Sequence, residues 1–497
     1  MLSVTLSPVA TGLAVAIMGV AYWVGWCIYC VWFHPLAKYP GPKAAAASDI
    51  WFVWAWTTGR YPHILEDAHR KYGDVVRIAP NELSFGTIQA HRDIYSTPSK
   101  TKKPFLKCGT FYNNGDVSNI FYELDPAEHA RMRKMLAPGF TGVAMKTHEH
   151  IIHHYVDMFV RKVGEISAAR QGAGVDVVEA VPWLAFDVMG ELTFGESFNA
   201  VASGQTHFWI SILADSAHAA ILPSFVRRAP SLVLMIPFML SISALRNLKT
   251  HYAYTLETVR RRLSRTNAER DIFTPVLEQG DITERQLVSL AQAMVIAGAD
   301  TVTTATTTAL YFLCATPGCL AKLEAEVRAL EYDQLTGVEV PQLRYLNAVI
   351  EESMRCFPPL AFGLPRVSPG EFVDGYFVPK GARLSAPHWV LNHNPQVWDK
   401  PYEFRPERWL RDDDKSNSDQ VAFPFSTGPR SCLGIAQANL EMRITLAKLV
   451  HTFDIHAARD PGDWIGDAQM NMMWKKAPLM VDFRPRDRDD LSYVKKQ

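Results

Sequence analysis

The stretch FSTGPRSCLG, Phe425 to Gly434, carries more information than any other part of this chain. Its glycines and its proline predict a loop that delivers Cys432 to the start of a helix. At that place the helix dipole and backbone N–H groups would lower the pKa of the thiol and prepare a thiolate for metal binding. Gly428 and Gly434 would let the loop turn tightly and approach a flat cofactor. A buried structural cysteine is the plain alternative.

Helical periodicity dominates the sequence around this loop. After Cys432, apolar residues recur at steps of three and four, at Ile435, Ala438, Met442, Leu446, Leu449 and Phe453. A second helix is predicted over residues 341–357, ended by Pro358. A very long helix is predicted from Thr283 to Ala315, with a capping box of Asp281 and Glu284 and a stop at Pro317.

Strand-like stretches are short by comparison, as at Val75 to Pro80 and around Phe372 to Val378. A chain of 497 residues with 48% hydrophobic content can bury a large core. The predicted class is therefore mainly α with small β-sheets. The polar run RDDDKSNSDQ, near residues 412–420, predicts a surface loop.

The middle of the long predicted helix reads AGADT, from Ala297 to Thr301. Gly298 costs that helix about 1 kcal/mol relative to alanine, which makes sense where bulk must be kept away from a ligand. The carboxylate of Asp300 and the hydroxyl of Thr301 are suited to relaying protons. The alternative is that Thr301 belongs to a threonine-rich run whose hydroxyls bond back to their own helix.

Three charged patterns lie farther from the cysteine loop. ESMR, Glu352 to Arg355, places a carboxylate and a guanidinium on one helical face, and FRPERW adds Arg408. HARMR places His129 and Arg133 one turn apart. Taken singly, such groups are ordinary surface charges, worth less than about 1 kcal/mol as pairs.

Together these motifs resemble the cytochrome P-450 family. FSTGPRSCLG is similar to its heme-binding signature F-x-x-G-x-R-x-C-x-G, and ESMR is similar to its E-x-x-R. AGADT resembles its oxygen-activation motif, and HARMR resembles its C-helix pair. The motifs follow the order and spacing of the family over nearly the whole chain. HPLAKYPGP and HARMRKMLAPGF look most like fungal members.

The resemblance implies heme b, iron protoporphyrin IX, as cofactor and Cys432 as the proximal ligand of its iron. The implied heme-binding residues are Phe425, Gly428, Arg430, Cys432, Gly434, His129, Arg133 and Arg366. Among these, Phe425 would shield the sulfur, and the basic residues would pair with heme propionates.

Two further groups of residues take their roles from the resemblance. Glu352, Arg355 and Arg408 would form a structural triad that holds the scaffold of the cysteine loop. Asp300 and Thr301 would act as catalytic residues that supply protons to bound dioxygen. Position 302 is valine where many relatives carry a second Thr or Ser, so the relay rests on those two residues.

The implied activity is a heme-dependent monooxygenase that hydroxylates or epoxidises a small molecule with dioxygen and electrons from NADPH. The chain has no Gly-rich dinucleotide loop and no fused flavin domain, so the electrons would come from a separate NADPH-cytochrome reductase, with cytochrome b5 as a further candidate partner. A heme-thiolate isomerase or dehydratase that needs no dioxygen is the first alternative, and a non-catalytic heme-binding protein is the second. The intact Asp300 and Thr301 weigh against both.

The first 33 residues predict a membrane anchor. No charged side chain occurs from Leu2 to Phe33, a stretch long enough to span a bilayer, and a cleaved signal peptide would show a basic start and a clear cleavage site. Residues 34–43 would form a proline-rich linker, and residues 44–497 the heme-thiolate domain. Lys38 and Lys43 place that domain in the cytosol by the positive-inside rule, so a single-pass protein of the endoplasmic reticulum membrane is expected.

The charge balance and the expected pocket walls indicate which classes of partner and substrate to expect. Lysine plus arginine equals aspartate plus glutamate at 51 each, so nucleic acid is not expected as a partner. By resemblance the walls are residues 107–121, 208–240, 360–364 and 471–474, which are mostly apolar. A lipophilic substrate is therefore expected. Its class, a terpenoid, polyketide or alkaloid of secondary metabolism, follows only from the likeness to fungal members.

Overall fold

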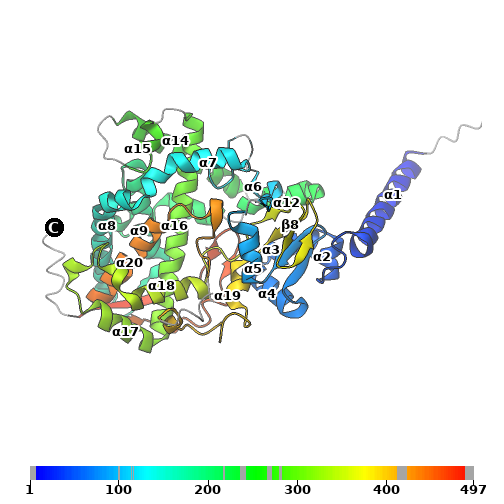
Figure 1. Ribbon diagram of the computed structural model, residues 1–497. Coiled ribbons are helices and arrows are strands. Elements are labelled where there is room, and N and C mark those ends of the chain that lie inside the picture. Colours follow the sequence, from blue (N-terminus) through cyan, green and yellow to red (C-terminus); the bar gives the residue numbers. More distant parts are fainter. Residues whose placement is uncertain are drawn as a thin grey trace, which may run out of the picture.

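The computed structural model describes residues 7–98, 101–113, 115, 117–216, 219–235, 242–265, 271–278, 282–410 and 422–486. Most of this part of the chain is helical (Figure 1). The helices are α1 Pro8–Ile28, α2 Lys43–Ala47, α3 Ile50–Thr57, α4 Tyr61–Tyr72, α5 Ile88–Tyr95, α6 Gly109–Tyr112, α7 Pro126–Leu136, α8 Gly142–Ala169, α9 Val177–Phe194, α10 Ala200–Ser203, α11 Phe208–Ser216, α12 Leu222–Arg228, α14 Ile242–Ser264, α15 Thr274–Glu278, α16 Glu284–Ala315, α17 Pro317–Val327, α18 Arg344–Cys356, α19 His388–His393 and α20 Ile435–Thr452.

Four small sheets complete the fold. A five-stranded sheet has the order β1-β2-β8-β5-β3, in which only β2 and β8 are parallel, and a three-stranded sheet has the order β4-β12-β9. Two further pairs, β6 with β7 and β10 with β11, are antiparallel hairpins. The strands are β1 Val75–Ala79, β2 Glu82–Phe85, β3 Leu106–Lys107, β4 Val175–Asp176, β5 Arg366–Val367, β6 Glu371–Val373, β7 Tyr376–Val378, β8 Arg383–Ser385, β9 Phe453–Ala457, β10 Gln469–Met470, β11 Trp474–Lys475 and β12 Met480–Pro485. The predicted class, mainly α with small β-sheets, is confirmed.

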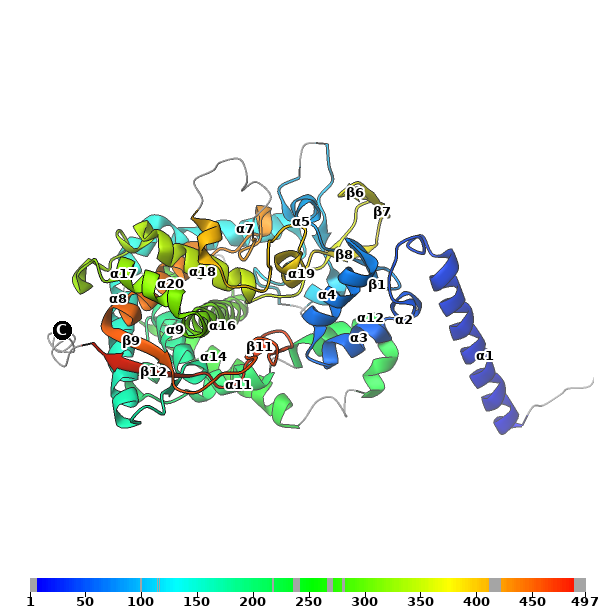
Figure 2. The same cartoon turned by 90° about the horizontal axis from the view of Figure 1, so that it is seen from below.

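The long helix α16 is the central element of the core. It packs against α9, α14, α18 and α20, and Figure 2 shows it nearly end-on within the helical part of the molecule. Every residue from Val302 to Leu310 is buried. The predicted bounds hold to within one residue, but the capping box is made by Thr283 and Gln286. Asp281 lies outside the described residues.

The other predicted elements differ from the structure mainly at their ends. Residues 340–342 form a 3-10 turn, so α18 begins at Arg344 instead of residue 341. Pro317 does not lead into a loop, because it occupies the first turn of α17, where its missing N–H costs nothing. The strand predicted around residues 372–378 is the β6–β7 hairpin, whose turn contains Gly375 at φ +77°. The polar run at 412–420 lies outside the described residues.

The N-terminal helix α1 stands apart from the rest of the molecule in both views (Figures 1 and 2). Together with a π-helical turn, it forms an apolar segment from Pro8 to Phe33, which has a mean hydropathy of 1.8 over 18 residues and in which Cys30 alone is buried. The helix α16 has comparable length and apolarity, yet it is the buried core helix of the domain. The N-terminal segment is therefore the candidate membrane span.

The segment after this helix is bound firmly to the domain. The backbone N–H of Arg77 on β1 donates to the carbonyl of Pro40 at 2.7 Å, and its guanidinium reaches the carbonyl of Cys30 at 2.8 Å. The hydroxyl of Tyr39 donates to the carbonyl of Phe377 on β7 at 2.7 Å. These bonds fix the place at which α1 leaves the domain.

One buried carboxyl group on α20 has no partner. Glu441 is 1% exposed, and neither of its carboxyl oxygens has a hydrogen-bond partner in the described part of the chain. Burial raises the pKa of Glu441 from 4.5 to about 8. This side chain is therefore a neutral acid at pH 7.

The substitution Glu441→Gln should flatten the pH dependence of stability. Between pH 4.5 and about pH 8 the native state holds a proton that the unfolded chain has lost, so stability falls as the pH rises. The slope approaches about 1.4 kcal/mol per pH unit, and a glutamine removes it. Urea unfolding of the full chain in detergent at pH 5, 6, 7 and 8 measures the difference. Parallel curves for the two proteins would contradict this prediction.

Candidate active site

The loop from Phe425 to Gly434 folds back on itself ahead of α20. The backbone N–H of Cys432 donates to the carbonyl of Phe425 at 2.9 Å, and that of Ser431 donates to the carbonyl of Gly428 at 3.0 Å. A single 3-10 turn occupies residues 428–430, and α20 begins at Ile435 with Gly434 as its N-cap. Of the seven free cysteines, Cys432 is the only exposed one. The loop thus presents one thiol, as expected of a ligand rather than of a structural cysteine.

The two glycines of this loop serve different purposes. Gly428 has φ +71°, and a Cβ there would collide with the carbonyl oxygen of Tyr95 on α5. The positive φ agrees with the tight turn expected at Gly428, and the close neighbour in the described chain is the backbone of α5. At Gly434 a Cβ would meet only a ring atom of Phe140 at 3.8 Å, an ordinary contact. The described chain therefore places no steric demand for glycine at position 434.

The environment of the Cys432 thiol differs from the expected one. Although Cys432 is exposed, desolvation by the surrounding protein raises the pKa of its thiol, and this outweighs the backbone N–H of Gly434 and the charge of Arg133, which lower it. The lowered pKa expected from the helix dipole is therefore wrong for the protein by itself, since Cys432 precedes the first turn of α20 by three residues. A thiol that coordinates a metal ion is deprotonated by the metal.

Five basic side chains gather beside this loop. Lys107 on β3 is paired directly with Arg366 on β5 in the sheet, an arrangement that destabilises like charges. His129 and Arg133 come from α7, and Arg430 comes from the cysteine loop. Lys107, Arg366 and Arg430 line one cavity of about 520 Å³.

These five groups repel one another electrostatically. Burial, followed by the charges of Arg430 and Arg366, lowers the pKa of Lys107 to about 6. Burial and four neighbouring cations, Arg430 first, lower the pKa of His129 to about 3. Burial and Arg366 lower the pKa of Arg430 to about 10. An anionic group in this place would relieve the repulsion, so the cluster suits a ligand with carboxylates.

Two of the predicted basic residues also hold the local backbone together. The guanidinium of Arg133 donates to the carbonyl of Ser431 at 2.7 Å, which ties α7 to the cysteine loop. Arg430 donates to the carbonyl of Glu123 at 2.6 Å, just ahead of α7. Arg366 is 3% exposed, and its guanidinium lies 5.2 Å from the ring centroid of Tyr95. Phe425 packs half-buried against the main core.

The middle of α16 is not buried throughout. Ala297 is exposed within this otherwise largely buried helix, and the hydroxyl of Thr301 donates to the carbonyl of Ala297 at 2.6 Å. Met189 of α9 links this point to α20, because its sulfur accepts a hydrogen bond from Gln437 at 3.1 Å. A Cβ at Gly298 would collide with the same Met189 side chain. A larger residue at position 298 would therefore have to displace the Met189 side chain.

Asp300 lies on another side of α16 from Thr301. Burial raises the pKa of its carboxyl, and the ammonium of Lys476 lowers it in part. Lys476, which follows β11, donates to the hydroxyl of Thr304 at 2.7 Å. The structure therefore places a cation beside Asp300 that the sequence motifs did not indicate.

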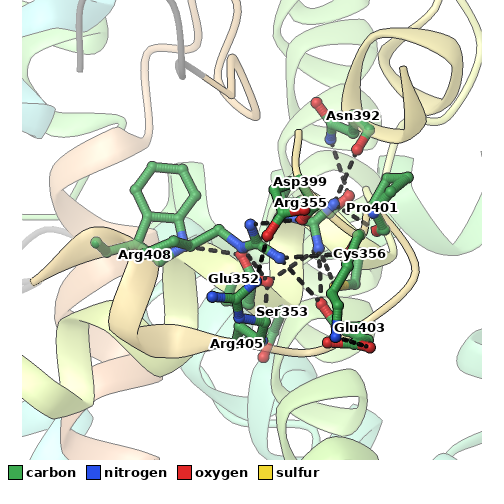
Figure 3. A network of polar contacts seen from close by, with 12 residues as sticks. Glu352, Ser353, Arg355, Cys356, Asn392, Asp399, Pro401, Glu403, Arg405 and Arg408 are labelled. Carbon is green, nitrogen blue, oxygen red and sulfur yellow. Dashed lines mark hydrogen bonds and ion pairs between the residues drawn. The ribbon is translucent and has the colours of Figure 1, made fainter. Parts of the chain in front are cut away.

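Glu352, Arg355 and Arg408 meet in one buried network (Figure 3). The carboxylate of Glu352 accepts from Nε of Arg355 at 2.9 Å and from Nε of Arg408 at 2.8 Å. It also accepts from the indole of Trp409 at 2.9 Å and from the backbone N–H of Arg405 at 3.0 Å. Burial would raise the pKa of Glu352, but the two guanidiniums outweigh burial and lower it.

The network organises the chain that leads toward the cysteine loop. Arg355 donates to the carbonyls of Asn392 at 2.8 Å and Pro401 at 2.7 Å, and Arg408 donates to that of Asp399 at 3.0 Å. Within the described residues, the hydrogen bonds of Arg355 and Arg408 go to residues 352–403 and not to 425–434. Any support for the cysteine loop is therefore indirect.

Sequence reasoning missed three residues of this region. Lys107 has no motif around it, and its place in the basic cluster follows from the pairing of β3 with β5. Lys476 reaches α16 from 172 residues away. Trp409 ends the FRPERW segment, which the sequence analysis had singled out. The hydrogen bond from its indole to Glu352 was nevertheless not expected. In the first two cases only the tertiary fold supplies the signal.

These features define a heme-thiolate protein. An exposed thiol on a loop and a buried basic cluster beside it fit iron protoporphyrin IX, which takes an axial sulfur ligand and carries two propionate carboxylates. A cytochrome P-450 family model matches residues 47–483, so the chain belongs to the cytochrome P-450 family. It is an enzyme of the oxidoreductase class, and heme is its cofactor.

Curated relatives cover most of the chain. It is 38% identical to the cytochrome P-450 monooxygenase BOA3 of Botryotinia fuckeliana, over 94% of this chain and 95% of that protein. It is 38% identical to poxC of Penicillium oxalicum, over 94% and 93%, and 36% identical to btcC of Colletotrichum orbiculare, over 95% and 94%. Both of these are also named cytochrome P-450 monooxygenases. The expected likeness to fungal members is confirmed.

Proposed function

We propose that this protein is a membrane-bound monooxygenase that transfers one oxygen atom from dioxygen to a lipophilic small molecule. The electrons would come from NADPH through a separate reductase. The observation that carries the proposal is the thiol of Cys432 beside the buried basic cluster, with Asp300 and Thr301 on the facing helix. The names of the relatives support the monooxygenase class.

Each group of residues has one task in this proposal. Heme supplies dioxygen activation when it is bound, and a thiolate ligand favours O–O cleavage. Cys432 holds the iron, while Lys107, His129, Arg133, Arg366 and Arg430 bind the propionates. Phe425 and Gly434 flank the sulfur, and Gly428 shapes the loop. Glu352, Arg355 and Arg408 keep residues 392–409 in place.

Asp300 and Thr301 are the proposed proton-supplying residues. Burial raises the pKa of Asp300, which makes its carboxyl a better proton acceptor than an ordinary aspartate. In the resting structure the hydroxyl of Thr301 donates to Ala297, so it must turn to donate elsewhere during turnover. An isomerase or dehydratase would not need this supply, and NADPH dependence of turnover distinguishes the two activities. A non-catalytic heme protein would show no turnover.

Thr301→Ala should retain heme but divert electrons from product to peroxide by tenfold or more, because proton supply contributes roughly 10²–10⁴-fold in general acid catalysis. Product formed per NADPH consumed is the quantity to measure, together with peroxide release. Thr308→Ala is the matched control, since it removes a buried, unpartnered hydroxyl from the same helix. Equal product yields in the two variants would make Thr301 a packing residue.

The substrate proposal rests on the expected pocket walls. Phe111, Tyr112, Ala361 and Phe362 belong to one buried apolar cluster, and Leu360, Leu364 and Met472 pack against it. Such walls favour a lipophilic molecule over a charged one. A terpenoid, polyketide or alkaloid intermediate of fungal secondary metabolism is proposed, with a fatty acid or aromatic xenobiotic as the alternative. Metabolite profiles of the source organism with and without this gene, followed by microsomal turnover of what accumulates, test it.

The proposed location is the endoplasmic reticulum membrane, with residues 44–497 as a cytosolic heme domain after a linker at 34–43. The apolar span of α1 and Lys38 and Lys43 behind it support this orientation. NADPH-cytochrome reductase, with cytochrome b5 as a second electron donor, is the proposed partner. No nucleic acid is expected to bind.

Deletion of Met1 to Phe33 should release the protein from membranes while the domain remains folded. In the described part of the deleted segment Cys30 alone is buried, so the domain loses few contacts, although Arg77 loses the carbonyl of Cys30. Extraction of membranes with alkaline carbonate measures stable insertion, and the reduced carbon-monoxide spectrum reports the fold. Complete extraction of the intact chain by carbonate would show that this segment does not span the bilayer.

A further inference from the structure

We propose that Lys476, in the loop after β11, is a positioning residue that stabilises the charged form of Asp300 for proton supply. The inference deepens the proposed monooxygenase function and rests on it for its catalytic meaning. The contact itself, between one loop and the middle of α16, does not depend on that function. No motif of the sequence indicates Lys476.

Lys476 contacts α16 through a hydrogen bond to a buried residue of that helix. The ammonium of Lys476 donates to Oγ1 of Thr304 at 2.7 Å, and Thr304 is 0% exposed. Thr304 lies four residues after Asp300, so the two side chains stand on one face of α16. Lys476 therefore approaches α16 on the face that carries Asp300.

The loop that carries Lys476 is held on both sides. Ahead of it, the indole of Trp474 donates to the carbonyl of Pro358 at 2.9 Å and its ring stacks on Phe357 with centroids 4.3 Å apart. Behind it, the carbonyl of Ala477 accepts from the indole of Trp464 at 2.7 Å. A lysine fixed in this way loses little additional conformational entropy when its ammonium stays at Thr304.

Lys475 and Lys476 face opposite ways. Lys475 ends β11 and is exposed, whereas Lys476 turns inward to Thr304. Successive residues of an extended chain alternate in direction, which explains how two adjacent lysines acquire different environments. Lys475 is therefore a matched control, with the same charge one residue away and no contact with α16 in the described structure.

The electrostatics of the pair agree with this geometry. Burial raises the pKa of Asp300, and Lys476 is the one charged group of the described chain that lowers it. Burial lowers the pKa of Lys476, and Asp300 is the one charged group that raises it. Burial thus draws the two pKa values toward each other, and the attraction between the opposite charges of Asp300 and Lys476 acts against this shift.

A charged Lys476 has a definite consequence for Asp300. Without the ammonium, burial alone acts on the carboxyl, which then stays protonated to higher pH. A carboxyl that keeps its proton cannot take up the next one, so proton supply to the Thr301 side of the helix would slow. Lys476 acts through Asp300 and does not touch the reacting atoms.

The test compares Lys476→Gln, Lys476→Arg, Lys475→Gln and Asp300→Asn in the full heme-loaded chain. Glutamine keeps a donor for Thr304 but removes the charge, and arginine keeps the charge. The infrared band of the protonated Asp300 carboxyl, identified by its loss in Asp300→Asn, is titrated with pH in each protein. The reduced carbon-monoxide spectrum verifies in each case that the domain is folded and holds heme.

We expect the titration of Asp300 to move upward by about 1–3 pH units in Lys476→Gln, the range for loss of a nearby opposite charge. Lys476→Arg and Lys475→Gln should titrate like the parent protein. Product per NADPH should fall in Lys476→Gln, and the double variant with Asp300→Asn should be no worse than Asp300→Asn alone.

An unshifted titration in Lys476→Gln, or an equal shift in Lys475→Gln, overturns the inference whatever the activity. A shifted titration in a protein that shows no NADPH-dependent turnover supports the pairing of Lys476 with Asp300 and overturns the proposed monooxygenase function instead.

Discussion

Cys432→Ser is expected to abolish the red-shifted Soret band that a thiolate-ligated heme shows when it is reduced and exposed to carbon monoxide. A hydroxyl is far less acidic than a thiol and a poor ligand for this iron, so the electronic effect of the sulfur is lost completely. The other six cysteines are buried or half-buried, and none of them lies in the loop that presents residue 432. Monooxygenase turnover should fall to background with the band.

Cys314→Ser supplies the control for this result. Cys314 is half-buried on α16, and burial raises the pKa of its thiol to about 12, which makes it a poor metal ligand. Its substitution should leave the spectrum unchanged. A red-shifted band that survives in Cys432→Ser would show that another group binds the iron.

Glu352→Gln is expected to prevent stable heme incorporation. The two fully buried guanidiniums of Arg355 and Arg408 would lose their shared carboxylate, and breaking a buried ion pair in this way costs about 3–5 kcal/mol. Residues 392–409 would lose their common anchor, since Arg405 and Trp409 also donate to Glu352. Heme content after purification and urea unfolding measure the effect.

The chain also contains an exposed ion pair that serves as a control for the buried pair of Glu352 and Arg355. Glu128 and Arg131 on α7 have the same three-residue spacing and a shortest separation of 2.6 Å, but their side chains are 36% and 41% exposed. Glu128→Gln should therefore cost less than about 1 kcal/mol, because water screens and replaces the interaction. Equal losses in the two variants would indicate that burial of Glu352 contributes nothing to its role.

The sequence predicted the helices well because their signals are local. The apolar spacing of residues 435–453 and the caps near 283 and 315 lie within the elements that they define, and the structure differs there by a few residues at most. The same holds for the family motifs, which are short and contiguous. Their agreement with the family model and with the fungal relatives confirms the family and the cofactor.

Residue environments could not be predicted in the same way. Gly298 was interpreted through a ligand, and the sequence did not indicate its neighbour Met189, more than a hundred residues earlier in the chain. The pKa of the Cys432 thiol was expected to fall, but desolvation by the surrounding protein raises it. The neighbours of a residue in space can belong to elements that the local sequence does not contain.

The sequence by itself determined the class of the fold and the family, and it indicated the proposed cysteine ligand and the proposed acid and alcohol on the long helix, since each depends on residues a few positions apart. Only the tertiary structure decided which charges meet. Lys107 joins Arg366 through strand pairing, and Lys476 reaches Thr304 from a loop 172 residues away. Electrostatic interactions depend on distance in space and on burial, and neither is encoded in the order of neighbouring residues.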